Sequence, residues 1–448
     1  MLKAFKIKKL FGEFDVNLSF RKGANIFVGE NGCGKTTILN CLYYILTSDF
    51  KKLAKINFEE IKLVLDKKQA IKLTKIDISE KTKNSSIGLA FQDRLVEITS
   101  SIFKYDDIEN IKSLYEKKDE AKLQPYIDIL SEKTSFPDFF IKKELKQTIR
   151  KMLIDEKIDM LKNFKDTYPI VYFPTYRRIE QDEHELGLDF DETTIRGREY
   201  MRRASIRRLR QNNLLIQFGM SDVEKTIDKV LNEIGRNAVK SFQDMAATLV
   251  NQYLIDKQEQ EKIKKLDKNK LGTILSRIDK ISEETKKTIL NLEETELKDK
   301  QELVRLLSNL IEAYDNQKEQ DDNIKNFCDV CNKYLRNKAF YYDENNLSLK
   351  ILKNENKKEI EMKDLSSGEK QIISIFSKLY LDNANKDCII LFDEPELSIS
   401  IDWQKTLIMD IMNTKKCSLL IAVTHSPFIF DNEKLFKITR SMEETFKK

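Results

Sequence analysis

Apolar positions recur with two different periods along the chain, and the change of period divides it. Residues 2–7, 14–20 and 24–28 are short apolar or alternating runs, which predicts three strands near the start. Residues 57–65 and 70–78 alternate apolar and polar positions, which predicts a hairpin beside them. Apolar residues at helical spacing follow between 105 and 165, so we expect a helical lobe there.

A long stretch with almost no glycine follows in the middle of the chain. Residues 221–338 contain only Gly235 and Gly272 and no proline, and apolar residues recur at three- and four-residue steps. This pattern predicts two long antiparallel helices broken near Gly272; with about 40 residues in each arm, the hairpin would project about 60 Å. Because the polar Gln317 and Asp321 interrupt the apolar seam, we expect it to be loose in the middle. A helical bundle packed on the core is the alternative.

Further apolar runs predict the strands that complete the core. They lie at 169–174, 338–352 (a hairpin), 388–393 and 418–423, and an apolar helix is expected at 372–381. The sequence therefore predicts an α/β fold in which residues 1–220 and 339–448 form two halves of one unit. Residues 221–338 would be a helical insertion between them.

A glycine-rich segment joins the predicted strand at 24–28 to a predicted helix at 38–46. Residues 29–37 read Gly-Glu-Asn-Gly-Cys-Gly-Lys-Thr-Thr and match G-x-x-x-x-G-K-[ST], the phosphate-binding loop. The glycines let backbone N–H groups converge, and the helix start adds partial positive charge. Lys35 would reach the β- and γ-phosphates, and the Thr36 hydroxyl would ligate Mg²⁺. The residues expected to hold the nucleotide here are Glu30, Asn31, Gly32, Cys33, Gly34, Lys35, Thr36 and Thr37.

Two later strands end in residues that suit nucleotide hydrolysis. The strand at 388–393 ends in Asp393 and Glu394, so Asp393 could hold the Mg²⁺ shell while Glu394 polarises the attacking water. The strand at 418–423 is followed by His425, for which we favour a γ-phosphate contact over a purely structural role. Ser366, Ser367 and Gly368 begin a predicted helix and could offer N–H groups to an anion.

The composition limits the class of protein but does not identify a binding partner. The chain has 448 residues, 40% hydrophobic and 34% charged, and its net charge of +5 does not by itself argue for nucleic acid. No apolar run reaches the ~18 residues of a membrane span, and the first residues lack a signal-peptide core. Six scattered cysteines, one of them inside the phosphate loop, favour a reducing cytoplasm. Only two histidines occur, which limits metal binding by histidine.

Charge clusters leave two alternatives open. Arg177 and its neighbour follow the strand at 169–174 and could meet a phosphate or an acidic partner. After the acidic stretch 180–192 come seven arginines, at positions 196, 198, 202, 203, 207, 208 and 210. They could form a nucleic-acid or acidic-partner surface, or simply pair with the acidic stretch. Cys328 and Cys331 are expected to be buried seam residues, because one such pair supplies only two metal ligands.

Together these motifs resemble the ABC-type ATPase head. The phosphate loop matches Walker A, residues 365–369 look like the signature, residues 389–394 are similar to Walker B with its catalytic glutamate, and His425 looks like the switch histidine. The resemblance implies that two heads close head to tail, so that Ser366 and Gly368 of one chain cap the ATP held by Lys35 of the other. Ser367 replaces the second signature glycine, and the segment after Glu394 lacks the family's D-loop aspartate.

The glutamine of the family's Q-loop has no secure position in this sequence. The strand that ends at residues 175–178, which include Arg177, is where we expect its equivalent. Gln92 and Gln181 are the weaker candidates.

The long insertion resembles the SMC, RecF and OLD-type group more than transporter subunits. Blocks at 172–180, 218–223 and 392–398 look like stand-alone bacterial AAA_15/AAA_21 ATPases, which include ATPase subunits of anti-phage systems such as PARIS and Septu. This implies a homo-oligomer that controls a separate effector nuclease of toprim or HNH type, since too few residues follow His425 for a nuclease domain. A DNA-binding repair ATPase of SMC or RecF type is the alternative. Neither implies a membrane partner.

Overall fold

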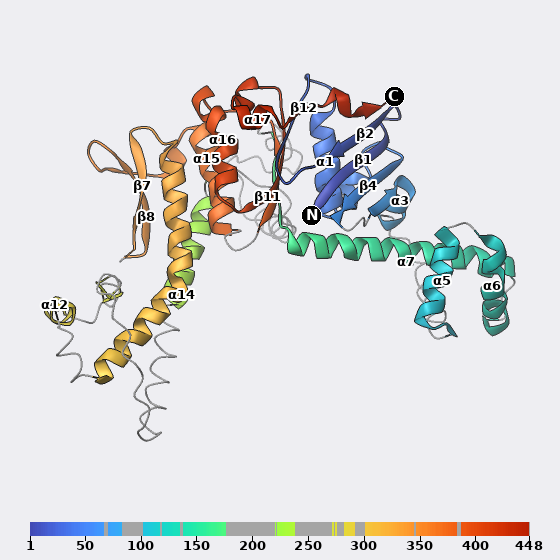
Figure 1. The fold of residues 1–448 in the computed structure, drawn as a ribbon, viewed down its shortest axis with the longest axis horizontal. Helices are drawn as coiled ribbons and strands as arrows, with labels where there is room; N and C mark the ends of the chain where they lie inside the picture. Colours follow the sequence, from blue (N-terminus) through green and yellow to red (C-terminus); the bar gives the residue numbers. More distant parts are fainter. Residues whose placement is uncertain are drawn as a thin grey trace, which may run out of the picture.

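We describe the fold from a computed structural model of the chain (Figure 1). The described residues are 1–66, 70–82, 102–116, 119–134, 138–175, 220, 222–237, 271–272, 274–275, 282–291, 301–344, 346–382 and 387–447. Several predicted features lie outside them: Arg177, Gln92, Gln181, the acidic stretch 180–192, the arginine cluster 196–210 and most of the first arm of the predicted helical hairpin.

An antiparallel sheet is built mainly from the start of the chain. Its order is β13-β2-β1-β4-β5. The strands are β1 (Leu2–Leu10), β2 (Phe14–Ser19), β4 (Glu60–Leu65), β5 (Ala70–Thr74) and β13 (Phe446–Lys447). Alternate residues of β4 and β5 are buried, because one side of the sheet packs on the core and the other faces outward. The predicted early strands and hairpin are confirmed, except that the hairpin begins at Glu60 instead of residue 57 and that its second strand ends early.

The second strand of that hairpin ends earlier than predicted. The sequence predicted a strand to residue 78, but helix α3 (Lys75–Thr82) begins directly after β5. Thr74 and Asp77 cause the change: the Thr74 N–H donates to Asp77 Oδ2 at 2.8 Å, and the Asp77 N–H donates to Thr74 Oγ1 at 3.3 Å. This reciprocal capping starts a helix, so Ile78 is buried from a helical turn while Ile76 is exposed.

A second sheet, entirely parallel, forms the centre of the molecule. Its order is β12-β3-β11-β10-β6. The strands are β3 (Gly23–Val28), β6 (Ile170–Phe173), β10 (Cys388–Asp393), β11 (Cys417–Thr424) and β12 (Thr439–Ser441). Since parallel strands share one carboxyl edge, residues that follow β3, β6, β10 and β11 gather there. The burial of all six residues of β10 fits a strand covered on both faces.

Helices cover the two faces of the parallel sheet separately. Helix α1 (Lys35–Leu46) packs with the sheet residues Ile389 and Leu391, and its core continues into the antiparallel sheet. Helices α15 (Ser367–Ser377) and α16 (Ile401–Asn413) pack against Ile390 and Phe392 on the opposite face. Successive residues of β10 therefore point alternately to the layer that contains α1 and to the layer that contains α15 and α16.

The predicted helical lobe is present and stands away from the sheets (Figure 1). The long helix α7 (Asp138–Thr167) carries α5 (Tyr105–Glu116) and α6 (Glu120–Thr134) at its far end. These three helices share a small core of their own, which includes Ile111, Leu130 and Leu145. A separate core of this kind makes the lobe a distinct packing unit.

The second arm of the predicted hairpin is one unbroken helix, α14 (Gln301–Asn332). Its last turns enter the core beside hairpin β7 (Lys338–Asp343) and β8 (Ser348–Lys353), and Cys328 and Cys331 are buried and free there, as predicted. The expectation of a loose seam is wrong at Asp321. That residue is 1% exposed, and its carboxylate accepts a hydrogen bond from Tyr342 Oη at 2.5 Å.

Shorter elements complete the described part of the chain. They are α2 (Phe50–Leu53), α12 (Glu283–Asn291), α17 (Glu433–Phe436), β9 (Glu359–Ile360) and the short helical turns η2 (Met362–Asp364), η3 (Lys378–Asp382), η4 (Pro427–Phe430) and η5 (Glu443–Thr445). Residues 222–237 are mostly helical. Among these and the longer helices, none is both long enough and apolar enough to cross a membrane.

Candidate active site

The glycine-rich loop turns between β3 and α1 at the carboxyl edge of the parallel sheet. Gly32 and Gly34 have φ of +86° and +85°, a left-handed conformation that favours glycine. A Cβ on Gly29 would lie 2.9 Å from Cys33 Sγ, so the loop is closed tightly on itself. Gly34 caps α1 without a side-chain hydrogen bond, which leaves the start of the helix facing the loop with its positive dipole end.

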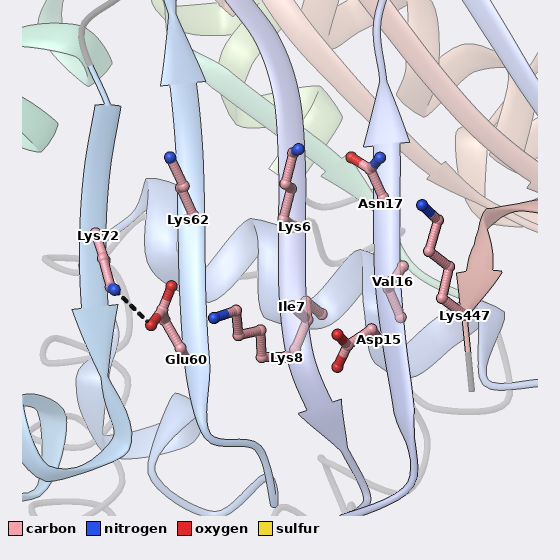
Figure 2. Close-up of a pocket in the computed structure, with 10 residues that line it drawn as sticks. All are labelled: Lys6, Ile7, Lys8, Asp15, Val16, Asn17, Glu60, Lys62, Lys72 and Lys447. Atoms are coloured by element: carbon pink, nitrogen blue, oxygen red, sulfur yellow. Dashed lines mark ion pairs between the residues drawn. The ribbon is translucent and has the colours of Figure 1, made fainter.

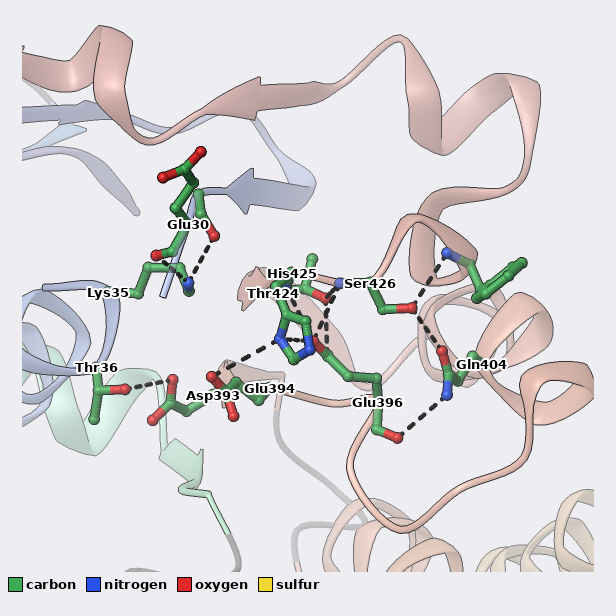
Figure 3. Close-up of polar contacts among 12 residues, drawn as sticks. Glu30, Lys35, Thr36, Asp393, Glu394, Glu396, Gln404, Thr424, His425 and Ser426 are labelled. Atoms are coloured by element: carbon green, nitrogen blue, oxygen red, sulfur yellow. Dashed lines mark hydrogen bonds and ion pairs between the residues drawn. The ribbon is translucent and has the colours of Figure 1, made fainter. Parts of the chain in front are cut away.

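Lys35 lies folded over the loop. Its Nζ donates to the carbonyl oxygens of Gly29 at 2.7 Å and Glu30 at 2.8 Å, and the residue is 5% exposed (Figure 3). Two carbonyl oxygens therefore hold the buried ammonium group inside the loop. The arrangement suits a phosphate group, which would offer the ammonium an anionic partner.

The end of β10 meets the start of α1 through a hydroxyl–carboxylate contact. Thr36 Oγ1 donates to Asp393 Oδ1 at 3.1 Å, and Thr175 Oγ1, just after β6, donates to Asp393 Oδ2 at 3.3 Å. Asp393 is 1% exposed. Hydroxyl and carboxylate oxygens are the ligands that Mg²⁺ prefers, so the set fits that ion, which would neutralise phosphate charge. Thr175 lies in the segment 175–178, where the Q-loop equivalent was expected, but the sequence did not single out this residue.

Glu394 and His425 lie side by side beyond this pair. Glu394 has a φ of +51°, and its N–H donates to the carbonyl of Val423 at 2.9 Å, which ties the turn after β10 to β11. The Nδ1 of His425 lies 3.9 Å from Glu394 Oε1, and both side chains remain partly exposed. A left-handed turn in a non-glycine residue is strained, and here it aims a carboxylate at the shared edge.

A second glutamate, Glu396, organises the histidine. Its Oε1 accepts from the His425 N–H at 2.9 Å and the Ser426 N–H at 3.2 Å and lies 2.8 Å from His425 Nδ1. Its Oε2 accepts from Thr424 Oγ1 at 2.8 Å. Gln404 of α16 extends this network, because its Nε2 donates to the Glu396 carbonyl and its Oε1 accepts from Ser426 Oγ at 2.7 Å (Figure 3). The imidazole is therefore held at Nδ1 by the Glu396 carboxylate.

The sequence reasoning missed Glu396 and Gln404. The available signal was a third carboxylate two residues after Glu394, close to the predicted carboxyl edge that also carries His425. Its partners lie 28 to 30 residues further along the chain, so only the pairing of β10 with β11 brings them together.

The predicted signature forms the capped start of α15. Ser366 Oγ accepts from the Glu369 N–H at 3.3 Å, and Glu369 Oε2 accepts from both the N–H and the hydroxyl of Ser366 at 2.9 Å, while Lys338 Nζ lies 3.0 Å away. Burial would raise the pKa of Glu369, but the hydrogen bonds from Ser366 and Lys338 outweigh it and lower the pKa. The cap is thus held by an ionised carboxylate.

Gly368 allows a second loop to approach this cap. A Cβ there would lie 2.4 Å from the backbone oxygen of Ser398 and 3.3 Å from Trp403, so only glycine fits against the segment that carries Glu396. Ser366, Ser367 and Gly368 lie at the start of α15, in the layer opposite α1 and Lys35. One chain therefore brings five of the predicted site residues together at the carboxyl edge of the parallel sheet: Lys35, Thr36, Asp393, Glu394 and His425. The predicted signature residues of the same chain lie in the opposite layer.

Residues 1–430 match the AAA ATPase domain family (AAA_15). The chain belongs to this family. An ATPase domain binds ATP and typically uses Mg²⁺, which agrees with the loop around Lys35 and with the adjacent hydroxyl and carboxylate oxygens of Thr36 and Asp393. The P-loop α/β fold predicted from the sequence is confirmed by the family and by the parallel sheet.

Other similarities of this ATPase domain are more distant. It is 29% identical over 123 residues to the DNA replication and repair protein RecF of Streptococcus gordonii, a match that covers 25% of this chain and 34% of RecF. The match thus spans about a third of that relative's length.

Two solved Smc head structures also align with the chain. One is the Pyrococcus furiosus Smc head with an extended coiled coil bound to the C-terminal domain of ScpA, at 13% identity and a TM-score of 0.32. The other is an Smc head bound to the winged-helix domain of ScpA, at 12% identity and a TM-score of 0.33. Each alignment covers 96% of this chain and 90% of the other.

Proposed function

We propose that this chain is an ABC-type ATPase of the SMC and RecF group that acts as an ATP-dependent sensor and scaffold in anti-phage defence. Two heads assemble head to tail around ATP, and the assembly holds or releases a separate effector nuclease of toprim or HNH type. Lys35 and the loop residues bind the phosphates, Thr36 and Asp393 hold Mg²⁺, Glu394 polarises the attacking water, and His425 contacts the γ-phosphate.

One observation carries the dimer proposal. The phosphate loop and the carboxylates occupy one edge of the sheet, whereas Ser366 caps a helix in the layer opposite α1. The dipole end of α15 is an anion-binding feature, and it lies in a different layer from the loop of its own chain. A second copy, turned head to tail, would supply this cap to the ATP.

The defence role is tested by co-expressing the chain with each nuclease-like protein encoded beside its gene. We expect a stable complex whose composition or nuclease activity changes when Glu394→Gln replaces the wild type and slows ATP hydrolysis. Glu433→Gln is the matched control, because Glu433 is an exposed glutamate that forms an ion pair with Lys437. The proposal is contradicted if the chain forms no complex with any of these proteins. It is also contradicted if neither the composition nor the nuclease activity of the complex changes with ATP hydrolysis.

A DNA-binding repair ATPase is the second candidate, favoured by the local match to RecF. This function predicts ATP-dependent DNA binding with a steep salt dependence and no associated effector. Binding measured across a salt series separates it from the first candidate. If DNA binding is absent or insensitive to salt, this second function is excluded.

A further inference from the structure

The outward side of the antiparallel sheet carries a concentration of lysines. Phe5 and Ile7 of β1 point inward to the core that includes α1, so the residues between and after them point outward. Five lysines of that outward side border a shallow concavity of about 400 Å³ (Figure 2). We call them the basic face: Lys6, Lys8, Lys62, Lys72 and Lys447.

Three of these lysines are direct neighbours across the strands. Lys6 of β1 pairs in register with Lys62 of β4, which pairs in register with Lys72 of β5. Like charges directly opposite each other destabilise a sheet. Lys72 has an ion pair with Glu60 at 2.7 Å, whereas Lys6, Lys8 and Lys62 have no ion pair with any described carboxylate. The row therefore leaves positive charge available to an external anion.

The positive surface continues past the edge of the sheet. Lys72 also borders a second concavity of about 540 Å³, whose other basic residues are Lys146, Arg150 and Lys157 of α7. Arg150 is already bound to Asp77, its Nη2 lying 2.6 Å from Oδ1. Because adjacent strands lie about 4.8 Å apart, the row from Lys6 to Lys72 alone spans about 10 Å. A track of this extent suits a polymer better than a single small anion.

The residue types favour a nucleic-acid duplex over a protein or a single strand. The outward positions of β1, β4 and β5 around the row are Ala4, Lys6, Lys8, Glu60, Lys62, Val64, Ala70, Lys72 and Thr74. None of them is aromatic. Protein interfaces favour aromatic residues and are depleted in lysine, and single strands are bound by stacking on aromatic rings. Duplex backbones require mainly cations that neutralise phosphates.

We propose that the basic face binds the phosphate backbone of a nucleic-acid duplex without sequence specificity. This inference deepens the second function proposed above, DNA binding, and rests on it. It does not depend on the nucleotide site, because the basic face is formed by the outward side of the sheet.

The test is fluorescence anisotropy with a labelled DNA duplex, and with an RNA duplex of the same sequence, over a series of salt concentrations. The test variant combines Lys6→Gln, Lys8→Gln and Lys62→Gln. The control variant combines Lys350→Gln, Lys363→Gln and Lys437→Gln, which removes the same charge from exposed lysines that pair with Glu359, Glu361 and Glu433. A third variant replaces the three test lysines by arginine. Circular dichroism and ATP turnover confirm that each variant is folded.

We expect wild-type binding to weaken steeply with salt. Each lost phosphate contact lowers the slope of log K against log salt by about 0.9, so the test variant should lose about 2 to 3 units of slope. The control and arginine variants should keep the wild-type slope. Tighter binding of DNA or of RNA then identifies the natural duplex.

Two results would overturn the inference, and only one of them would also exclude the DNA-binding function. If the test variant binds like the control, the basic face is not the binding surface, while the DNA-binding function itself survives. If the wild type binds neither duplex, both the surface and the second proposed function are wrong.

Discussion

Removing the Glu396 carboxylate should loosen the junction between the turn after β10 and the end of β11. Glu396 is 6% exposed, and its two oxygens accept from Thr424 Oγ1 and from the N–H groups of His425 and Ser426. In Glu396→Ala the Thr424 hydroxyl and the His425 N–H lose this acceptor, whereas the Ser426 N–H still donates to Thr424 Oγ1 at 3.0 Å. Thr424 is fully buried and Ser426 is 8% exposed, so water reaches them poorly.

The expected loss in the free energy of unfolding can be estimated from the donors that lose this acceptor. Each buried group left without a partner costs about 1–3 kcal/mol, and such losses within one network are not additive. We therefore expect Glu396→Ala to lower the free energy of unfolding by about 2–4 kcal/mol. Glu396→Gln should lose only about 1–2 kcal/mol, because its amide oxygen still accepts from the two backbone N–H groups.

Urea denaturation of the wild type, both variants and the control Glu433→Ala measures these differences. The control should stay within about 0.5 kcal/mol of the wild type, since Glu433 is exposed. ATP turnover adds a second readout: kcat should fall more than KM rises, because His425 loses the group that orients its ring. Glu396→Ala with wild-type stability and turnover would refute the reasoning.

Gly368→Ala should destabilise the protein by about 1–3 kcal/mol in urea denaturation, because its Cβ would lie 2.4 Å from the Ser398 carbonyl oxygen; an unchanged transition would contradict the close approach. Lys35→Ala should weaken the binding of fluorescent ATP at least tenfold by removing the ammonium held in the loop, and unchanged affinity would exclude the phosphate role. The lowered pKa of Glu369 stabilises the fold above its unfolded pKa of about 4.3, and this stabilisation is lost as the pH falls toward the folded pKa. The thermal midpoints of wild type and Glu369→Gln should therefore converge below about pH 4, whereas a constant gap across pH would argue against an ionised cap.

Local sequence signals were enough to predict the position and the backbone conformation of the phosphate loop. The glycines at 32 and 34 adopt the left-handed backbone that the motif requires, and the loop lies between the predicted strand and helix. The paired Asp393 and Thr36 also follow from local patterns, because parallel strands must share a carboxyl edge. These features depend on short segments whose chemistry is visible in the sequence.

Features set by distant contacts escaped prediction. Glu396 resembles an ordinary turn residue until β10 pairs with β11 and brings it to His425. Asp321 interrupts an apolar seam in the sequence, but Tyr342 of the following hairpin satisfies its carboxylate. Alternation alone extended β5 too far, because the capping of Thr74 by Asp77 competes with the strand pattern.

Light scattering after size-exclusion chromatography tests the central claim that ATP joins two heads. Glu394→Gln with ATP and Mg²⁺ should elute at twice the mass that it has without nucleotide. Adding Ser366→Arg should restore the single mass, because the bulky cation blocks the start of α15. One mass in every condition, or a dimer unaffected by Ser366→Arg, would contradict the claim.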